Sequence, residues 1–237
     1  MVEHRVYVSH MPKELPDRAQ VVIVGGGIIG ASIAYHLTKR GIFDVVILEQ
    51  GQLTGGTTWH AAGLVSQLKS TYSLTKLATY SAQLFEELEE ETGQATGYRT
   101  PGSISVAADQ ERWEELKRGI SMASTVGVDI REIEMDELKE FWPLINLDDL
   151  VGALYIPKDG VTSPVDTTMA LIKGARNGGA KIYRKNRVTD IKQLPSGEWK
   201  VFTENGDIIC EHVVNAAGSF CPEVGAMVGL KEVPSIN

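Results

Sequence analysis

The sequence has little of several residue classes, and each shortage narrows the kind of protein that it encodes. Among 237 residues there are two cysteines, Cys210 and Cys221, spaced for neither a CxxC redox pair nor a zinc site. No apolar run approaches the roughly 18 residues of a membrane-spanning helix, since the richest, Val21–Tyr35, contains four glycines and a serine. Basic residues are fewer than acidic ones, giving a net charge of −8, which argues against nucleic acid or an anionic membrane as partner. The composition is otherwise that of an ordinary globular protein, and the chain is long enough for one or two domains.

The first 19 residues predict a polar leader. They include Glu3, Glu14 and Asp17 and no apolar segment of signal-peptide length, and transit peptides avoid acids. We interpret the two cysteines as small side chains that are buried or half-buried, which fits a reducing compartment. We therefore expect a cytoplasmic protein if the source is bacterial, and a mitochondrial-matrix protein if it is eukaryotic.

Residues 21–49 predict a β-α-β unit. Val21–Val24 is a short β-branched run, typical of a strand that is buried on both faces of a parallel sheet. A glycine-rich turn follows, and apolar residues then recur at helical spacing as far as the stop signal Lys39–Gly41. Val45–Leu48 predicts a second buried strand, which ends at Glu49.

The turn of this unit has the GxGxxG spacing, with Gly25, Gly27 and Gly30. The first glycine permits the tight turn, the second lets the backbone approach a pyrophosphate, and the third allows close packing of helix and strand. Glu49 follows by about 20 residues, where a carboxylate accepts from ribose hydroxyls. With this context the motif predicts dinucleotide binding, although a glycine-rich turn without a ligand is the alternative. Glu49 disfavours a 2′-phosphate, and these residues leave FAD and NAD open.

The rest of the chain mixes helices with strands. Between 96 and 159 the pattern predicts an inserted α+β module, and Asn205-Gly206 is a strong hairpin signal between two later strands. The expected helices are 70–91, 111–126, 135–141 and 166–177, and the expected strands are 102–108, 152–156, 181–183, 188–194, 199–203 and 208–214.

A second motif runs from Gly55 to Gly63, where small residues surround Trp59 and His60. Such a composition suggests backbone packed closely against a flat group. A single histidine is more often a hydrogen-bonded core or capping residue than a chemical group, so His60 by itself is weak evidence.

The two motifs together resemble the dimethylglycine dehydrogenase and sarcosine dehydrogenase family, which are FAD-dependent amine dehydrogenases of the D-amino-acid-oxidase superfamily. The resemblance covers nearly the whole chain from Val21 onward. Beside the Gly-Thr-Thr-Trp-His-Ala-Ala-Gly-Leu block, it is carried by residues 88–93, 101–104, 142–144, 159–160 and 213–218.

The resemblance implies an FAD that is joined covalently to His60 through its 8α-methyl carbon. It also implies cofactor contacts from the loop over the flavin, the end of the second strand, the helix start, the strand at Val188 and the Ala-Gly turn near Phe220, where relatives often have Trp. The implied cofactor-binding residues are Gly25, Gly27, Ile28, Ile29, Gly30, Glu49, Gln50, Gly56, Thr57, Thr58, Trp59, His60, Ala61, Ala62, Gly63, Leu64, Val188, Gly218 and Phe220.

The fold that we expect is α/β: a Rossmann-like FAD-binding domain with an inserted α+β substrate domain, as in D-amino-acid oxidase. The expected FAD-binding domain comprises 20–95 and 160–237, and the start of the substrate domain comprises 96–159. Enzymes of this resemblance are much longer, so we expect a fragment or a truncated reading frame. Catalytic residues and any folate-binding module would then lie beyond Asn237. We find no metal-ligand pattern.

The implied activity is oxidative demethylation of an N-methylated amino acid such as dimethylglycine or sarcosine, by hydride transfer to flavin. Electron-transfer flavoprotein or another carrier would accept the electrons, and tetrahydrofolate would bind only if the full protein has the further module. One alternative is an oxidoreductase of the same superfamily with non-covalent FAD, acting on a D-amino acid or glycerol 3-phosphate. Another is a regulatory relative without enzymatic activity.

Overall fold

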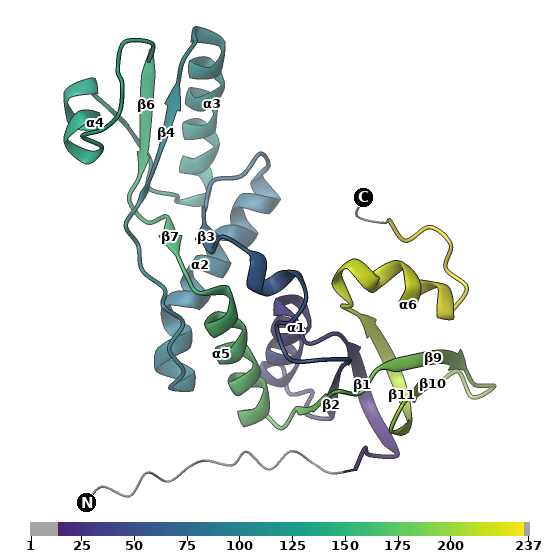
Figure 1. The fold of residues 1–237 in the computed structure, drawn as a ribbon. Coiled ribbons are helices and arrows are strands. Elements are labelled where there is room, and N and C mark those ends of the chain that lie inside the picture. Colours follow the sequence, from purple (N-terminus) through teal and green to yellow (C-terminus); the bar gives the residue numbers. More distant parts are fainter. Residues whose placement is uncertain (1–13, 235–237) are drawn as a thin grey trace, which may run out of the picture. The chain divides into compact units, whose positions relative to one another are not determined.

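The computed structural model describes residues 14–234, so most of the expected leader lies outside the described residues. Contacts divide the chain into two compact units (Figure 1). Unit 1 contains residues up to Ala61 and from Thr168 onward, and unit 2 contains Ala62–Thr167. These limits differ from the expected boundaries at 95/96 and 159/160. The long helix α2 (Tyr72–Thr92) is grouped with unit 2, where it packs on α3 (Gln110–Val126).

Unit 1 is built on a six-stranded sheet with the order β8-β2-β1-β11-β10-β9. The four strands from β8 to β11 in this order run parallel, whereas β11, β10 and β9 are joined antiparallel. The strands are β1 (Arg18–Val24), β2 (Val45–Glu49), β8 (Lys181–Arg184), β9 (Val188–Gln193), β10 (Trp199–Thr203) and β11 (Gly206–Asn215).

The predicted β-α-β unit is confirmed. Helix α1 (Ile28–Lys39) connects β1 to β2, which are parallel neighbours. Adjacent residues of β1, Val22 and Ile23, are both fully buried, as expected for a central strand that is covered on its two faces. Cys210 is buried in the same core, and neither it nor Cys221 forms a disulfide.

The hairpin at Asn205-Gly206 is confirmed as well. Thr203 pairs with Gly206 across the turn, and Gly206 has φ +134, which a side chain would rarely tolerate. After β11 come a short 3₁₀ turn, η2 (Gly218–Phe220), and a helix that the periodicity did not predict, α6 (Cys221–Met227). Helix α5 (Pro164–Asn177) begins in unit 2 and continues in unit 1.

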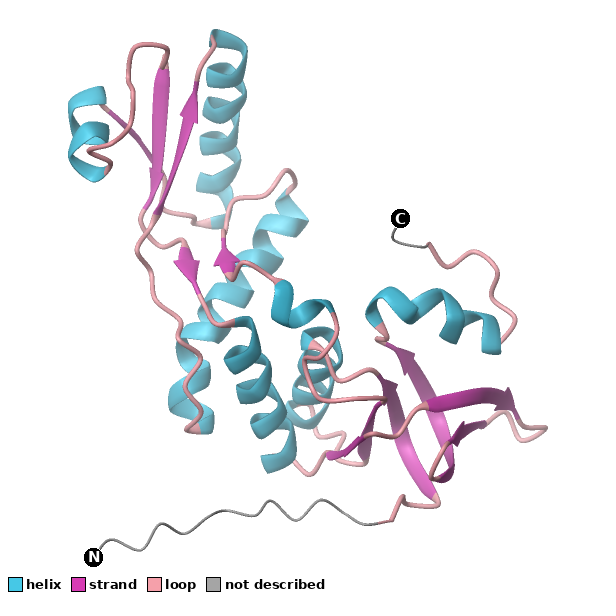
Figure 2. Cartoon of the chain, viewed as in Figure 1, coloured by secondary structure: helices cyan, strands magenta, loops and turns pink. Residues whose placement is uncertain are grey.

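Unit 2 is an α+β module, as expected for the inserted segment (Figure 2). Its three-stranded antiparallel sheet, β4-β6-β5, has Leu154 facing α3 and Ala153 facing α4. A second, two-stranded sheet pairs β3 with β7. The elements other than α2 and α3 are β3 (Leu64–Val65), β4 (Ser103–Ala107), β5 (Arg131–Ile133), α4 (Met135–Phe141), β6 (Gly152–Ile156) and β7 (Gly160–Val161).

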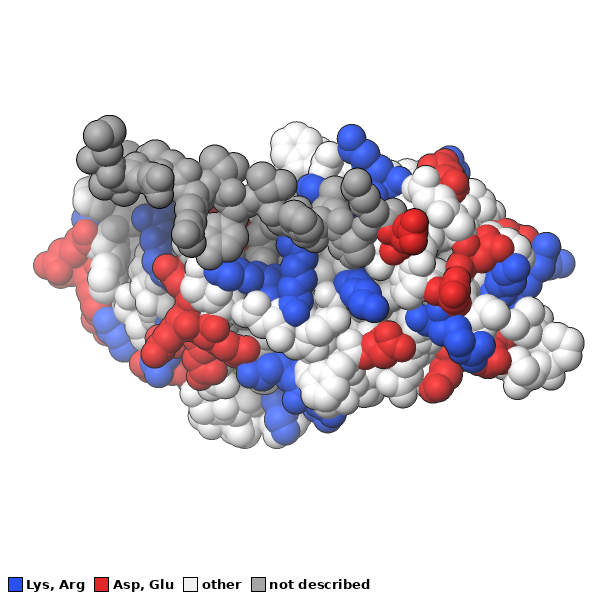
Figure 3. All heavy atoms as spheres, turned by 90° about the horizontal axis from the view of Figure 1, so that it is seen from below, with Lys and Arg blue, Asp and Glu red and all other residues white. Residues whose placement is uncertain are grey.

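Charged side chains of both signs are interspersed on the face shown in Figure 3. Among the described residues on that face, no continuous basic surface is visible. Within residues 14–234, none of the helices has both the length and the apolar character needed to cross a membrane.

Candidate functional site

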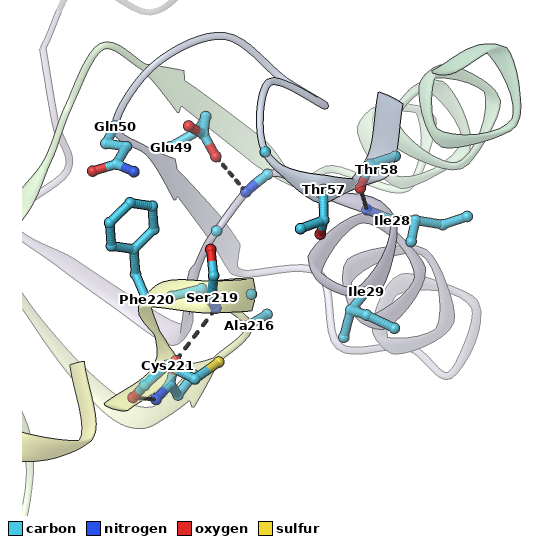
Figure 4. A pocket seen from close by; sticks show the side chains of 17 residues that line it. Ile28, Ile29, Glu49, Gln50, Thr57, Thr58, Ala216, Ser219, Phe220 and Cys221 are labelled. Atoms are coloured by element: carbon cyan, nitrogen blue, oxygen red, sulfur yellow. Dashed lines mark hydrogen bonds between the residues drawn. The ribbon is translucent and has the colours of Figure 1, made fainter. Parts of the chain in front are cut away.

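A cavity of about 240 Å³ lies in unit 1 where β1, β2 and β11 end (Figure 4). Parallel strands deliver the segments that follow them to one edge of the sheet, which is the usual place for a ligand in an open α/β sheet. The lining comes from four segments: Gly25–Ile29, Glu49–Gln50, Gly56–Thr58 and Asn215–Cys221.

The glycine-rich turn leaves no room for side chains at two of its motif positions. Gly25 has φ +114, and a Cβ built on it would lie 2.2 Å from the Ala216 carbonyl oxygen. A Cβ on Gly30 would lie 2.0 Å from the Gly25 carbonyl oxygen. Both neighbours are backbone atoms that cannot rotate away, so the close approach of β1, α1 and the end of β11 requires glycine.

The N-terminus of α1 opens toward the cavity. Its N-cap is Gly27, which has no side chain to cap the helix. The Ile28 N–H instead donates to Thr58 Oγ1 at 3.1 Å. Ile29 lines the cavity, and within residues 14–234 no acceptor is assigned to its N–H. A helix start of this kind attracts anions through its N–H groups and the positive end of the dipole.

Glu49 lies at the end of β2 and is held by two backbone donors. The Gly26 N–H donates to Oε2 at 2.8 Å, and the Gly51 N–H donates to Oε1 at 2.7 Å. Each carboxylate oxygen can accept more than one hydrogen bond, so Glu49 keeps capacity for a ligand hydroxyl. The two contacts also join the glycine-rich turn to the end of β2.

A smaller hollow of about 90 Å³ adjoins Glu49 and Gln50. Val188, the first residue of β9, lies in its wall together with Arg187, and Phe220 lines both this hollow and the larger cavity. Val188 therefore comes close to the end of β2 although the two strands are not adjacent in the sheet.

The segment after β11 contributes residues that the sequence did not single out. Asn215 holds this segment at two points, because its Nδ2 donates to the Cys221 carbonyl at 2.8 Å and its Oδ1 accepts from the Ala217 N–H at 3.3 Å. The lining residues missed by sequence reasoning are Gly26, Asn215, Ala216, Ala217, Ser219 and Cys221. The motif 213–218 was a signal for part of this set, but its place beside the glycine-rich turn depends on the pairing of β1 with β11.

His60 lies at the end of the 3₁₀ turn η1 (Thr57–His60). Its Nδ1 lies 3.2 Å from the Gly56 carbonyl oxygen, and its ring packs on Trp59 with a centroid distance of 4.0 Å. Both rings are exposed, Trp59 to 57%. Neither ring lines the cavity, whereas Thr57 and Thr58 of the same turn do.

The predicted cofactor residues thus separate into groups. The larger cavity brings together Gly25, Gly27, Ile28, Ile29, Glu49, Gln50, Gly56, Thr57, Thr58, Gly218 and Phe220. Val188 reaches the smaller hollow, and Gly30 packs against Gly25 behind the cavity. Trp59, His60 and Ala61 end the exposed turn, and Ala62, Gly63 and Leu64 belong to unit 2.

Comparisons with known proteins agree with this architecture. The chain is 44% identical to rat (Rattus norvegicus) dimethylglycine dehydrogenase over 92% of its length, but it spans 26% of that protein. Mouse (Mus musculus) sarcosine dehydrogenase is 39% identical over 92% of the chain, which spans 24% of it. The regulatory subunit of mouse pyruvate dehydrogenase phosphatase is 43% identical over 89%, and the chain again spans 24%.

Among solved structures, L-proline dehydrogenase from P. horikoshii superposes with a TM-score of 0.86 at 29% identity. The match covers 93% of this chain and 58% of that one. The expected D-amino-acid-oxidase-like α/β fold is thereby confirmed. A family model described as FAD dependent oxidoreductase matches residues 20–236. The chain therefore belongs to the FAD-dependent oxidoreductase family.

Proposed function

We propose that the protein containing this chain catalyses the oxidative demethylation of an N-methylated amino acid of the dimethylglycine or sarcosine class, with FAD bound covalently through His60. The observation that carries this proposal is the position of the histidine. His60 stands on a turn that is hydrogen-bonded to the glycine-rich turn, within a chain 44% identical to a dimethylglycine dehydrogenase.

The residues around the cavity fit the dinucleotide part of FAD. The start of α1, where Thr58 caps only the Ile28 N–H, offers the Ile29 N–H to a pyrophosphate. Glu49, fixed by two N–H donors, offers its remaining acceptor capacity to ribose hydroxyls. Gly25 and Gly27 keep this wall free of side chains, so the backbone can approach phosphate oxygens closely.

His60 is suited to form a bond through its outer nitrogen. When Nδ1–H donates to the Gly56 carbonyl, Nε2 carries the lone pair and is the nucleophilic atom. Formation of the bond between Nε2 and the 8α carbon would release the imidazole proton and one methyl proton, and it would leave two electrons on the flavin for molecular oxygen to accept. The link holds the ring without relying on binding free energy.

When bound, FAD supplies a hydride acceptor for a C–H bond adjacent to an amine nitrogen. The iminium product would add water and release formaldehyde, or pass its carbon to tetrahydrofolate if the full protein has the module. Electron-transfer flavoprotein or another carrier would then take the electrons.

A second candidate function rests on the 43% identity to a regulatory subunit. In that case the fold would remain while flavin chemistry is lost. The presence of His60 and of a helix start that lines the cavity favours the enzyme. A third possibility, an oxidoreductase with non-covalent FAD, would keep the cavity and leave His60 unmodified.

The test is anaerobic titration of the purified full-length protein with dimethylglycine, sarcosine, a D-amino acid and glycerol 3-phosphate. Bleaching of the oxidised flavin spectrum by a methylated glycine alone, with formaldehyde released after aeration, is the expected result. Bleaching by the D-amino acid or by glycerol 3-phosphate would contradict the substrate class. A protein that purifies without flavin and binds none would support the regulatory subunit.

A further inference from the structure

The loop 52–60 is tied to the glycine-rich turn at two points. The Thr54 N–H donates to the Gly26 carbonyl at 3.1 Å, and Thr58 Oγ1 accepts from the Ile28 N–H at 3.1 Å. The second contact is made by a side chain, and Figure 4 shows it beside the cavity. Thr58 is 9% exposed, which makes it the buried member of η1.

This contact replaces a cap that the helix does not have locally. A helix is normally capped by the side chain of the residue just before it, which accepts from an N–H of the first turn. Here that residue is Gly27, and the acceptor comes from Thr58, far along the chain. A Cβ on Gly27 would lie 3.0 Å from Thr58 Oγ1, so the glycine leaves room for the hydroxyl.

Within residues 14–234, few other hydrogen bonds attach the turn that carries His60. Its own hydrogen bonds, from the Ala61 N–H to the Thr58 carbonyl and between His60 Nδ1 and the Gly56 carbonyl, hold it together as a unit. Trp59 is 57% exposed, so burial of its ring does not anchor the turn. The Thr58 hydroxyl is therefore the side-chain contact that fixes this unit to α1.

We propose that Thr58 is a positioning residue for the covalent attachment of FAD. By capping α1 it fixes the position of the turn that presents the His60 imidazole to the flavin. This inference rests on the proposed covalent link at His60. It assigns to Thr58 a role in the formation of the bond, apart from any contribution to the affinity for FAD.

Two substitutions separate this role from a general effect on folding. Thr58→Val keeps the shape of the side chain and removes the acceptor, whereas Thr58→Ser keeps the hydroxyl. Thr38→Val is the matched control, because Thr38 is also buried and also hydrogen-bonds through Oγ1, to the Tyr35 carbonyl at the other end of α1. His60→Ala sets the level of zero covalent flavin.

The experiment measures covalent incorporation over time. Full-length apoprotein is incubated with FAD, samples are precipitated with acid, and flavin is measured in the pellet and in the supernatant. A helix cap is worth about 1 kcal/mol, so we expect Thr58→Val to incorporate covalent flavin about fivefold more slowly than the wild type. Thr58→Ser should restore most of the rate, and Thr38→Val should leave it unchanged.

Each result has a definite meaning. A wild-type pellet with covalent flavin and an equal rate in Thr58→Val would overturn the role of Thr58 and leave the proposed function intact. Slowing of the rate by Thr38→Val to the same extent would also overturn it, since the effect would then come from α1 stability. A wild-type protein without covalent flavin would overturn both the covalent link and this inference.

Discussion

The carbonyl oxygen of Gly25 occupies the place where a Cβ of Gly30 would stand, 2.0 Å from the ideal position. A Cβ on Gly25 would in turn lie 2.2 Å from the Ala216 carbonyl oxygen. The third glycine of the motif is thus required by a contact within the motif itself.

Substitution of Gly30 by Ala should therefore destabilise unit 1. The new methyl meets backbone that cannot move aside, and we expect a loss of about 3 kcal/mol in the free energy of unfolding. Gly41→Ala is the matched control, because Gly41 has φ +86 with no atom nearby, and it should cost about 1 kcal/mol from backbone strain alone. Urea unfolding of the two variants measures which of them loses more free energy of unfolding. Equal losses would show that the Gly25 contact carries no energy.

The carboxylate of Glu49 should contribute to stability even without a cofactor. Glu49→Gln replaces one of its two acceptor oxygens by an amide N–H₂, which would face a backbone N–H. We expect a loss of about 1–3 kcal/mol in the apoprotein, from one unsatisfied donor. Thermal unfolding beside the exposed control Glu204→Gln measures it. If Glu49→Gln and the control unfold at the same temperature without FAD and at different temperatures with FAD, the carboxylate contributes only to ligand binding and the prediction is wrong.

The sequence was informative where local pattern decides the structure. Val21–Val24 and Val45–Leu48 are β-branched runs on each side of a glycine turn, and such a unit forms from neighbouring residues. Helix α6 was missed because it spans seven residues and contains Pro222 and Gly225. β3 and β7 have two residues each, too few for a periodic pattern.

The site was predictable in part for the same reason. The glycine-rich turn and Glu49 follow from local spacing, but Asn215 and Cys221 reach the cavity through the pairing of β1 with β11, which lie far apart in the sequence. The bond from Ile28 to Thr58 has no sequence signal, because helix caps are normally local.

In unit 2, Asp159 should be a stability determinant. It is 3% exposed, and its carboxylate accepts from the Gln67 N–H at 2.8 Å and from the Ser103 hydroxyl at 2.6 Å. Asp159→Ala removes both acceptor oxygens and leaves the buried Gln67 N–H without an acceptor, and we expect a loss of about 1–3 kcal/mol. Limited proteolysis within residues 62–167 measures local opening, with the exposed Asp149→Ala as control. Equal cleavage rates for the two variants would refute the prediction.

Alkaline pH should weaken unit 1 through Cys210. Burial raises the pKa of its thiol from 9.0 to about 11. The folded state then holds the thiol proton more tightly than the unfolded state, so this contribution is complete below pH 9 and is lost as the pH rises toward 11. Burial also raises the pKa of Tyr183. Because Tyr183 is present in both the wild type and Cys210→Ala, its contribution cancels when the two proteins are compared. Between pH 8 and pH 10.5 we expect the wild type to lose more stability than Cys210→Ala, by denaturant unfolding. Parallel pH profiles would contradict this.

Peptide mapping is the direct test of whether His60 carries the flavin. The full-length protein is denatured in acid, digested, and separated with flavin fluorescence and mass detection. We expect one flavin-bearing peptide, which contains His60 and is heavier by one FAD less two hydrogens. If all flavin separates from the protein in acid, or if the flavin-bearing peptide lacks His60, the claim is wrong.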